Sequence, residues 1–90
     1  MERYYVYILL SLQDNKFYTG FTINLKQRLQ QHARGEVRST KLRLPIKLIH
    51  YEYFINKDDA KAREVFLKSG FGRQQLKLAI KRTLEEFNII

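Results

Sequence analysis

Arg28 and His32 combine side chains suited to phosphate chemistry with a spacing that brings them together. Leu25, Arg28, Leu29 and His32 follow the i, i+3, i+4, i+7 pattern, so they share one stripe of a helix. A guanidinium binds phosphate through its planar fork of donors, and an imidazole donates a hydrogen bond or moves a proton near neutral pH. The structural alternative is that Arg28 extends its charge outward over an apolar stem while His32 is a hydrogen-bonded residue at the core boundary.

Glu64 is a carboxylate among basic residues in a second expected helix. Hard divalent cations take oxygen ligands, so such a carboxylate anchors a metal against a phosphate, with water and substrate completing the ligand set. The alternative is an exposed i,i+4 ion pair with Lys68, worth about 0.3–0.5 kcal/mol. That alternative follows from the expectation that Ala62, Val65 and Phe66 form the buried stripe and that Glu64 lies roughly opposite them.

Tyr7 and Tyr18 place two phenols on the two strands of an expected hairpin. Aromatic residues on strands usually pack, and the chain has six tyrosines, so neither residue alone indicates a site. Core packing and contact with a substrate both remain open for this pair.

The elements that must position these residues can be read from hydrophobic periodicity and from turn and cap signals. Their order is ββαβαα, which predicts an α+β fold: a small three-stranded antiparallel sheet flanked by helices. With 90 residues, we expect one domain spanning 1–90. The expected strands are 4–10, 17–20 and 46–55, and the expected helices are 24–33, 56–69 and 72–87.

Composition narrows the class of protein. Seventeen Lys and Arg against nine Asp and Glu give a net charge of +8, which favours an anionic partner, with nucleic acid ahead of a membrane surface. The absence of cysteine excludes disulfides, thiolate zinc sites and a thiol nucleophile. The apolar runs are too short to span a membrane, so we expect a cytoplasmic protein with no membrane partner.

Several motifs in combination resemble one family. They are Tyr5-Val-Tyr7, Tyr18-Thr-Gly20, Arg28 with His32, Glu64, and Lys68-Ser-Gly-Phe-Gly-Arg73. From about Tyr4 to Lys77 the chain resembles the GIY-YIG nucleases, in particular the short standalone bacterial members. It departs from the GIY-YIG motifs that give the family its name at Tyr5, Val6 and Thr19. Family enzymes often have an asparagine in the last helical part, where this chain has Leu76-Lys-Leu-Ala79.

The resemblance implies hydrolysis of DNA phosphodiester bonds with one divalent metal, Mg²⁺ or Mn²⁺, and no small-molecule cofactor. It assigns the motif tyrosines to Tyr7 and Tyr18, the motif glycine to Gly20, the catalytic arginine to Arg28, the histidine to His32 and the metal ligand to Glu64. In this interpretation Arg28 holds a non-bridging oxygen, and Tyr7, Tyr18 or His32 acts on the attacking water. A phenol has a pKa near 10, so a tyrosine base requires nearby cations, for which Arg28 and His32 are candidates.

We expect little sequence specificity, because phosphate contacts carry no base information and no separate recognition module is present. Structure-selective cleavage in DNA repair agrees with that expectation. A non-catalytic basic module that binds nucleic acid is the alternative from another class, and an RNA-associated basic protein is a third. The expected phosphate contacts are Lys41, Arg43, Lys68, Arg73 and Lys77.

Overall fold

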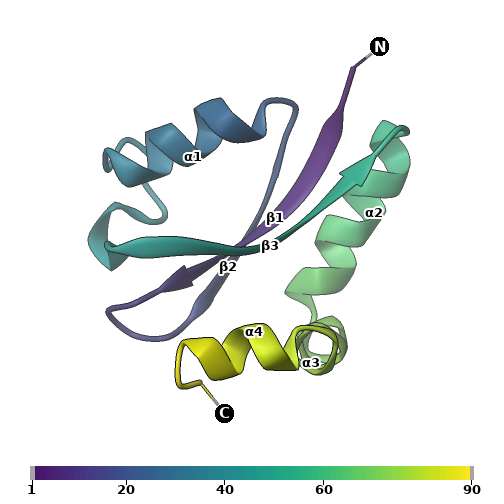
Figure 1. The fold of residues 1–90 in the computed structure, drawn as a ribbon. Helices are drawn as coiled ribbons and strands as arrows, with labels where there is room; N and C mark the ends of the chain where they lie inside the picture. Colours follow the sequence, from purple (N-terminus) through teal and green to yellow (C-terminus); the bar gives the residue numbers. More distant parts are fainter. Residues whose placement is uncertain (1, 90) are drawn as a thin grey trace.

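The computed structural model describes residues 2–89 and contains a three-stranded antiparallel sheet with helices on both faces (Figure 1). The strand order is β2-β1-β3, so β1 is the central strand. The expected α+β architecture is therefore confirmed. The elements are β1 (Tyr4–Ser11), β2 (Phe17–Thr22), α1 (Leu25–Ala33), the short 3₁₀ helix η1 (Lys41–Arg43), β3 (Ile46–Phe54), α2 (Lys57–Lys68), α3 (Gly70–Ala79) and α4 (Lys81–Glu86).

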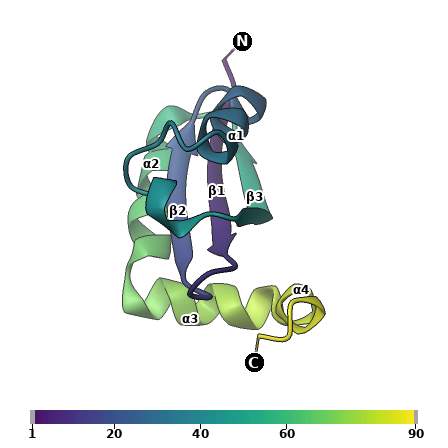
Figure 2. The same cartoon turned by 90° about the vertical axis from the view of Figure 1, so that its left-hand side faces the viewer.

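The two faces of β1 belong to different layers. Val6 and Ile8 are fully buried in a core cluster with residues of α2, α3 and α4. Tyr5 and Tyr7 alternate with them along the strand and so point to the opposite face, where α1 crosses the sheet. Figure 2 shows α1 near one end of the strands and α3 at the other end. One face of the sheet is thus an apolar core, and the other is lined by aromatic residues.

Helix α1 has the bounds and the orientation that the sequence predicts. The Asn24 side chain caps its first turn by accepting a hydrogen bond from the Gln27 backbone N–H at 3.1 Å. Gly35, with a φ of +75°, lies just beyond its end. His32 is fully buried, and Arg28 and Leu29 are half-buried. The stripe that carries Arg28 and His32 therefore faces the sheet.

The buried face of α2 differs from the expected one. Ala60 and Leu67 are buried, whereas Ala62 and Val65 are exposed, Val65 by 71%. Helical periodicity is compatible with either stripe facing the core, because apolar residues occur both on the stripe of Ala60 and Leu67 and on that of Ala62 and Val65. The small side chain of Ala60 lies in the core cluster of β1, and this contact fixes the rotation of the helix. The expected buried stripe was wrong for Ala62 and Val65, although Phe66 is partly buried against the core. Glu64 lies at helical spacing from the buried Ala60 and Leu67, so it is on the buried side of α2.

A bidentate ion pair ties α2 to the sheet. Arg63 donates from Nε and Nη2 to the two carboxylate oxygens of Glu52 on β3, at 2.9 and 3.1 Å. His50 lies 2.9 Å from the same carboxylate through its Nε2. Burial tends to raise the pKa of Glu52, but hydrogen bonds from Arg63 and His50 outweigh it and leave that pKa below its usual value. This pairing holds the helix that carries Glu64 in place over the sheet.

The last expected helix, 72–87, is two helices. It breaks at Ile80, whose φ of −111° and ψ of 29° are not helical, and the chain resumes as α4. Ile80 and Leu84 are both buried in the core cluster, which explains why the chain turns back rather than running straight on. Within residues 2–89, no helix has the length and apolar character needed to cross a membrane.

Candidate active site

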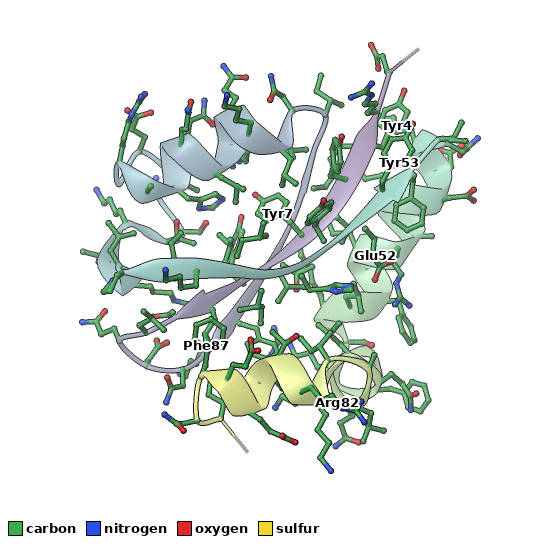
Figure 3. All side chains as sticks on the ribbon, viewed as in Figure 1. Tyr4, Tyr7, Glu52, Tyr53, Arg82 and Phe87 are labelled. Carbon is green, nitrogen blue, oxygen red and sulfur yellow. The ribbon has the colours of Figure 1, made fainter. Side chains whose placement is uncertain are left out.

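Tyr7 and His32 form a buried pair between the sheet and α1. The Tyr7 Oη and His32 Nε2 atoms are 2.9 Å apart, and His32 Nδ1 lies 2.7 Å from the Thr40 hydroxyl. All three residues are fully buried. Figure 3 shows Tyr7 between the sheet and α1. Both ring nitrogens of His32 have protein partners, so His32 is held in one orientation and sets the position of the Tyr7 hydroxyl.

Gly20 makes room for the Tyr7 ring. It is the β2 partner of Tyr7 in the antiparallel register, and a Cβ at this position would collide with Cζ and Oη of Tyr7. The ring therefore lies across the backbone of β2 at the place where a side chain would otherwise stand. Since β2 is an edge strand, this arrangement carries the Tyr7 hydroxyl toward the edge of the sheet.

Tyr18 supplies the second phenol from the edge strand β2. Its ring centroid lies 5.3 Å from that of His32 and 6.4 Å from that of Tyr7, so the three rings form one aromatic cluster. The side chain is half-buried, and within residues 2–89 its hydroxyl makes no hydrogen bond to the protein. Of the two phenols, Tyr18 therefore has the hydroxyl that is free to contact a bound molecule.

Arg28 adds a cation to this cluster. Its Nη1 donates to the Gln31 Oε1 at 3.1 Å, which leaves other guanidinium donors for a ligand. Burial raises the pKa of Tyr7, and the nearby Arg28 guanidinium opposes this effect. Burial, with a smaller contribution from Arg28, also holds the pKa of His32 at about 4. His32 is neutral near pH 7, so it does not supply the positive charge that we considered for it, and Arg28 carries that role alone.

Glu64 reaches the same edge of the sheet from α2, on the opposite face. Helix α2 packs along β1 and β2, and Lys61, one turn before Glu64, stacks over the Phe21 ring of β2 at 4.3 Å. The Glu64 side chain is only 14% exposed. Burial is the main cause of the raised pKa of Tyr7, and the charge of Glu64 adds a small contribution in the same direction.

The sequence pattern of the GIY-YIG catalytic domain matches residues 3–77, a range that contains every residue of this candidate site. The chain belongs to the GIY-YIG family. This is a nuclease family whose members act on DNA and generally require a divalent metal. The prediction made from the motifs, including the short bacterial subgroup, is confirmed.

Bacterial proteins that carry the name UPF0213 resemble this chain over most of their length. A UPF0213 protein of Clostridium perfringens (strain 13 / Type A) is 39% identical over 85 residues, covering 93% of this chain and 90% of the relative. One from Staphylococcus haemolyticus (strain JCSC1435) is 37% identical over 83 residues, covering 91% and 100%. The solution NMR structure of a UPF0213 protein from Bacillus halodurans shares 34% identity with a TM-score of 0.53, covering 82% of this chain and 81% of that one.

Glu64 fits a metal held by a single carboxylate of the GIY-YIG domain. Within residues 2–89, no three His, Cys, Asp or Glu residues are grouped as a complete protein ligand set. Mg²⁺ is commonly bound through one or two carboxylates, with waters and substrate phosphate completing the shell. The Glu64 oxygens are paired with Lys68 Nζ at 3.0 Å and Lys61 Nζ at 3.6 Å. The donor chemistry is therefore suitable, and both lysines must give up their pairing when a cation binds.

The five expected phosphate contacts fall in different places on the GIY-YIG domain. Arg43, Arg73 and Lys77 line one hollow of about 410 Å³ beside the turn between β1 and β2, together with Lys16. Lys68 is paired with Glu64, and Lys41 is exposed on η1 without lining that hollow. Three of the five thus converge on a single basic hollow, which periodicity alone did not indicate.

Sequence reasoning missed three residues of this site. Thr40, Gln31 and Lys61 hold His32, Arg28 and Glu64, respectively. Gln31 and Lys61 lie three residues from their partners, so helical spacing contained a usable signal. Thr40 contacts His32 across the loop between α1 and η1, where no periodic pattern applies.

The low pKa of His32 predicts acid sensitivity of the fold. An unfolded His titrates near 6.5, so between pH 6.5 and about 4 the unfolded chain binds a proton that the folded chain excludes. The free energy of unfolding should therefore fall as the pH is lowered through this window. Urea titrations of wild type and His32→Gln should show a shallower acid slope in the variant. His50→Gln, the matched control, should keep the His32 part of the slope; equal slopes in His32→Gln and wild type would contradict the prediction.

Proposed function

We propose that this chain is an endonuclease that hydrolyses DNA phosphodiester bonds with one divalent metal, Mg²⁺ or Mn²⁺. The observation that carries the proposal is the cluster of Tyr7, Tyr18 and His32 beside Arg28 on one face of the sheet, in a chain of the GIY-YIG family. Glu64 lies on α2, the helix packed on the other face. Binding phosphate requires cations, but it does not require a carboxylate that is only 14% exposed among them. We propose one catalytic domain over residues 1–90, acting in the cytoplasm.

We assign each residue of the site a separate role in phosphodiester hydrolysis. Arg28 presents its planar donors to the non-bridging oxygens, where negative charge grows in the transition state. The Tyr18 hydroxyl orients the attacking water, and Tyr7, kept protonated by its raised pKa, holds the geometry with His32. Water oxygen bonds to phosphorus, the bond to the leaving oxygen breaks, and that oxygen departs with a proton. A divalent cation held by Glu64 supplies Lewis acidity at the phosphate.

The basic hollow supports binding of the DNA backbone rather than of bases. Lys16, Arg43, Arg73 and Lys77 gather around it, and phosphate contacts of this kind position a strand without reading its sequence. We therefore propose low sequence specificity, with selection by DNA structure, as in repair of branched or damaged DNA.

A binding module without catalysis is the second candidate, and one observation favours it. Lys61 and Lys68 already neutralise Glu64, so the carboxylate has a structural partner without any metal. In that case the chain would use the same basic hollow to hold nucleic acid and would not cleave it.

A cleavage assay separates these two functions. The purified chain is incubated with duplex, single-stranded and branched DNA, in Mg²⁺ or Mn²⁺ and in EDTA, and the products are resolved on denaturing gels. The nuclease predicts internal cuts that require the metal and that do not depend on sequence. Binding of these DNAs without any cut, in either metal, would instead support the binding module.

A further inference from the structure

Three tyrosines continue the aromatic face of the sheet beyond the candidate active site. Tyr5 of β1 pairs with Tyr53 of β3, and Tyr7 pairs with Tyr51 of β3, so these side chains share one face. The Tyr5 ring centroid lies 5.6 Å from Tyr53 and 6.1 Å from Tyr51. Tyr53 lies along the sheet from Tyr7, toward the end where the chain begins (Figure 3). We name Tyr5, Tyr51 and Tyr53 the tyrosine platform.

The platform is open to solvent because α1 covers only part of this face. Tyr51 is 52% exposed and Tyr53 is 47% exposed, and neighbouring exposed aromatic rings of this kind mark a binding surface. A hollow of about 330 Å³ is lined by Arg3 and the three platform tyrosines. A second hollow, of about 570 Å³, runs from Tyr5 and Tyr51 to the start of α1 and is also lined by Lys26. Among the described residues, the lining of both hollows includes cations and no carboxylate.

Resting on the proposed function, we infer that the tyrosine platform binds unpaired bases of a single-stranded segment that leads to the active site. Exposed aromatic rings beside cations stack bases, while the cations hold the connecting phosphates. Bases of an intact duplex stack on each other, so their faces are closed to such rings. The platform therefore selects strands that are single, frayed or flapped.

The tyrosine platform lies next to the proposed catalytic residues on the same face of the sheet. Tyr51 on the platform is the register partner of Tyr7, so platform and active site are adjacent on one sheet face. A strand whose bases stack on Tyr53, Tyr5 and Tyr51 brings its next phosphates toward Tyr7 and Arg28. Arg3 and Lys26 provide the positive charge along the way, which a protein partner of apolar character would not need.

Binding measured without metal tests the platform independently of cleavage. Fluorescence anisotropy in EDTA gives the affinity of labelled oligothymidylate, oligouridylate and a blunt duplex for wild type, Tyr53→Ala, Tyr51→Ala and Tyr53→Phe. Each Ala variant should lose about tenfold in affinity for the single strands and little for the duplex, and Tyr53→Phe should retain binding. Phe71→Ala, which removes a 67% exposed ring on α3, is the matched control and should leave both affinities unchanged.

Several outcomes would contradict the proposal that the tyrosine platform binds single strands. They are equal losses on single strand and duplex, a loss in Phe71→Ala as large as in Tyr53→Ala, or no binding of single strands by wild type. Circular dichroism verifies that each variant is folded. If single strands bind to the platform but no DNA is cleaved, this inference stands and the proposed nuclease function is wrong. If duplex DNA is cleaved but single strands do not bind to the platform, the nuclease function stands and this inference is wrong. Thymidylate and uridylate arms show whether the strand is DNA or RNA.

Discussion

Glu64→Gln should lower metal-dependent DNA cleavage by at least ~100-fold, the scale of losing one electrostatic stabiliser of a transition state. The substitution removes the carboxylate that we propose as the anionic ligand of a cation in the site. Gln keeps the length and helix propensity of Glu, so only the pairing with Lys61 and Lys68 is lost from the fold. The two lysines are about half exposed, at 52% and 53%, so losing these pairs should cost about 1 kcal/mol and the variant should remain folded.

DNA affinity in EDTA should be unchanged or higher in Glu64→Gln. Removing the carboxylate frees the ammonium groups of Lys61 and Lys68, which then face phosphate without a competing anion. The paired measurements are the cleavage rate with Mg²⁺ or Mn²⁺ and the affinity in EDTA. Glu86→Gln, on the exposed surface of α4, is the matched control and should match wild type in both. Wild-type cleavage by Glu64→Gln would show that the metal binds elsewhere.

The site residues that follow one regular element were predictable from the sequence. Arg28 and His32 share the sheet-facing stripe of α1 because a helix repeats every 3.6 residues, and that stripe was unambiguous. Tyr7 and Gly20 meet because both belong to a hairpin whose register is set by a short turn. In these cases local geometry alone determines which side chains come together.

Features that depend on packing between elements were not predictable in the same way. Helix α2 has apolar residues on two stripes, and the choice of Ala60 over Ala62 depends on the sheet that it contacts. The break at Ile80 has the same origin, because the buried Ile80 and Leu84 turn the chain back onto the core. The contact between His32 and Thr40 crosses a loop, where the sequence has no period to read.

Resemblance to the GIY-YIG family supplied what physical patterns did not. Glu64 alone is indistinguishable from an exposed helical ion pair, and the structure confirms that the pair with Lys68 exists. Its low exposure and its effect on the pKa of Tyr7 are properties of the folded chain. The ion pair of Glu64 is therefore confirmed, and its role as a metal ligand stays a prediction.

Arg28→Lys should lose most of the cleavage activity, about 100-fold, although the positive charge is kept. A guanidinium offers a planar fork that matches two phosphate oxygens, whereas an ammonium is a single point charge. Arg28 donates to Gln31 Oε1 from Nη1 and keeps other nitrogens for phosphate, whereas the single ammonium nitrogen of lysine cannot serve both partners with the same geometry. Because this fork acts on charge that develops in the transition state, the loss should appear in kcat rather than in DNA affinity.

The control for this variant is Arg34→Lys, an exposed arginine at the end of α1 that lies outside the aromatic cluster. It changes the same chemical group without touching Tyr7 or His32, and its cleavage rate should equal that of wild type. Single-turnover cleavage at saturating DNA gives the chemical step, and anisotropy in EDTA gives the affinity. If Arg28→Lys cleaves at the wild-type rate, Arg28 is a packing residue whose stem fills the space beneath α1. Rapid cleavage by Arg34→Lys together with slow cleavage by Arg28→Lys would place the guanidinium at the reacting phosphate.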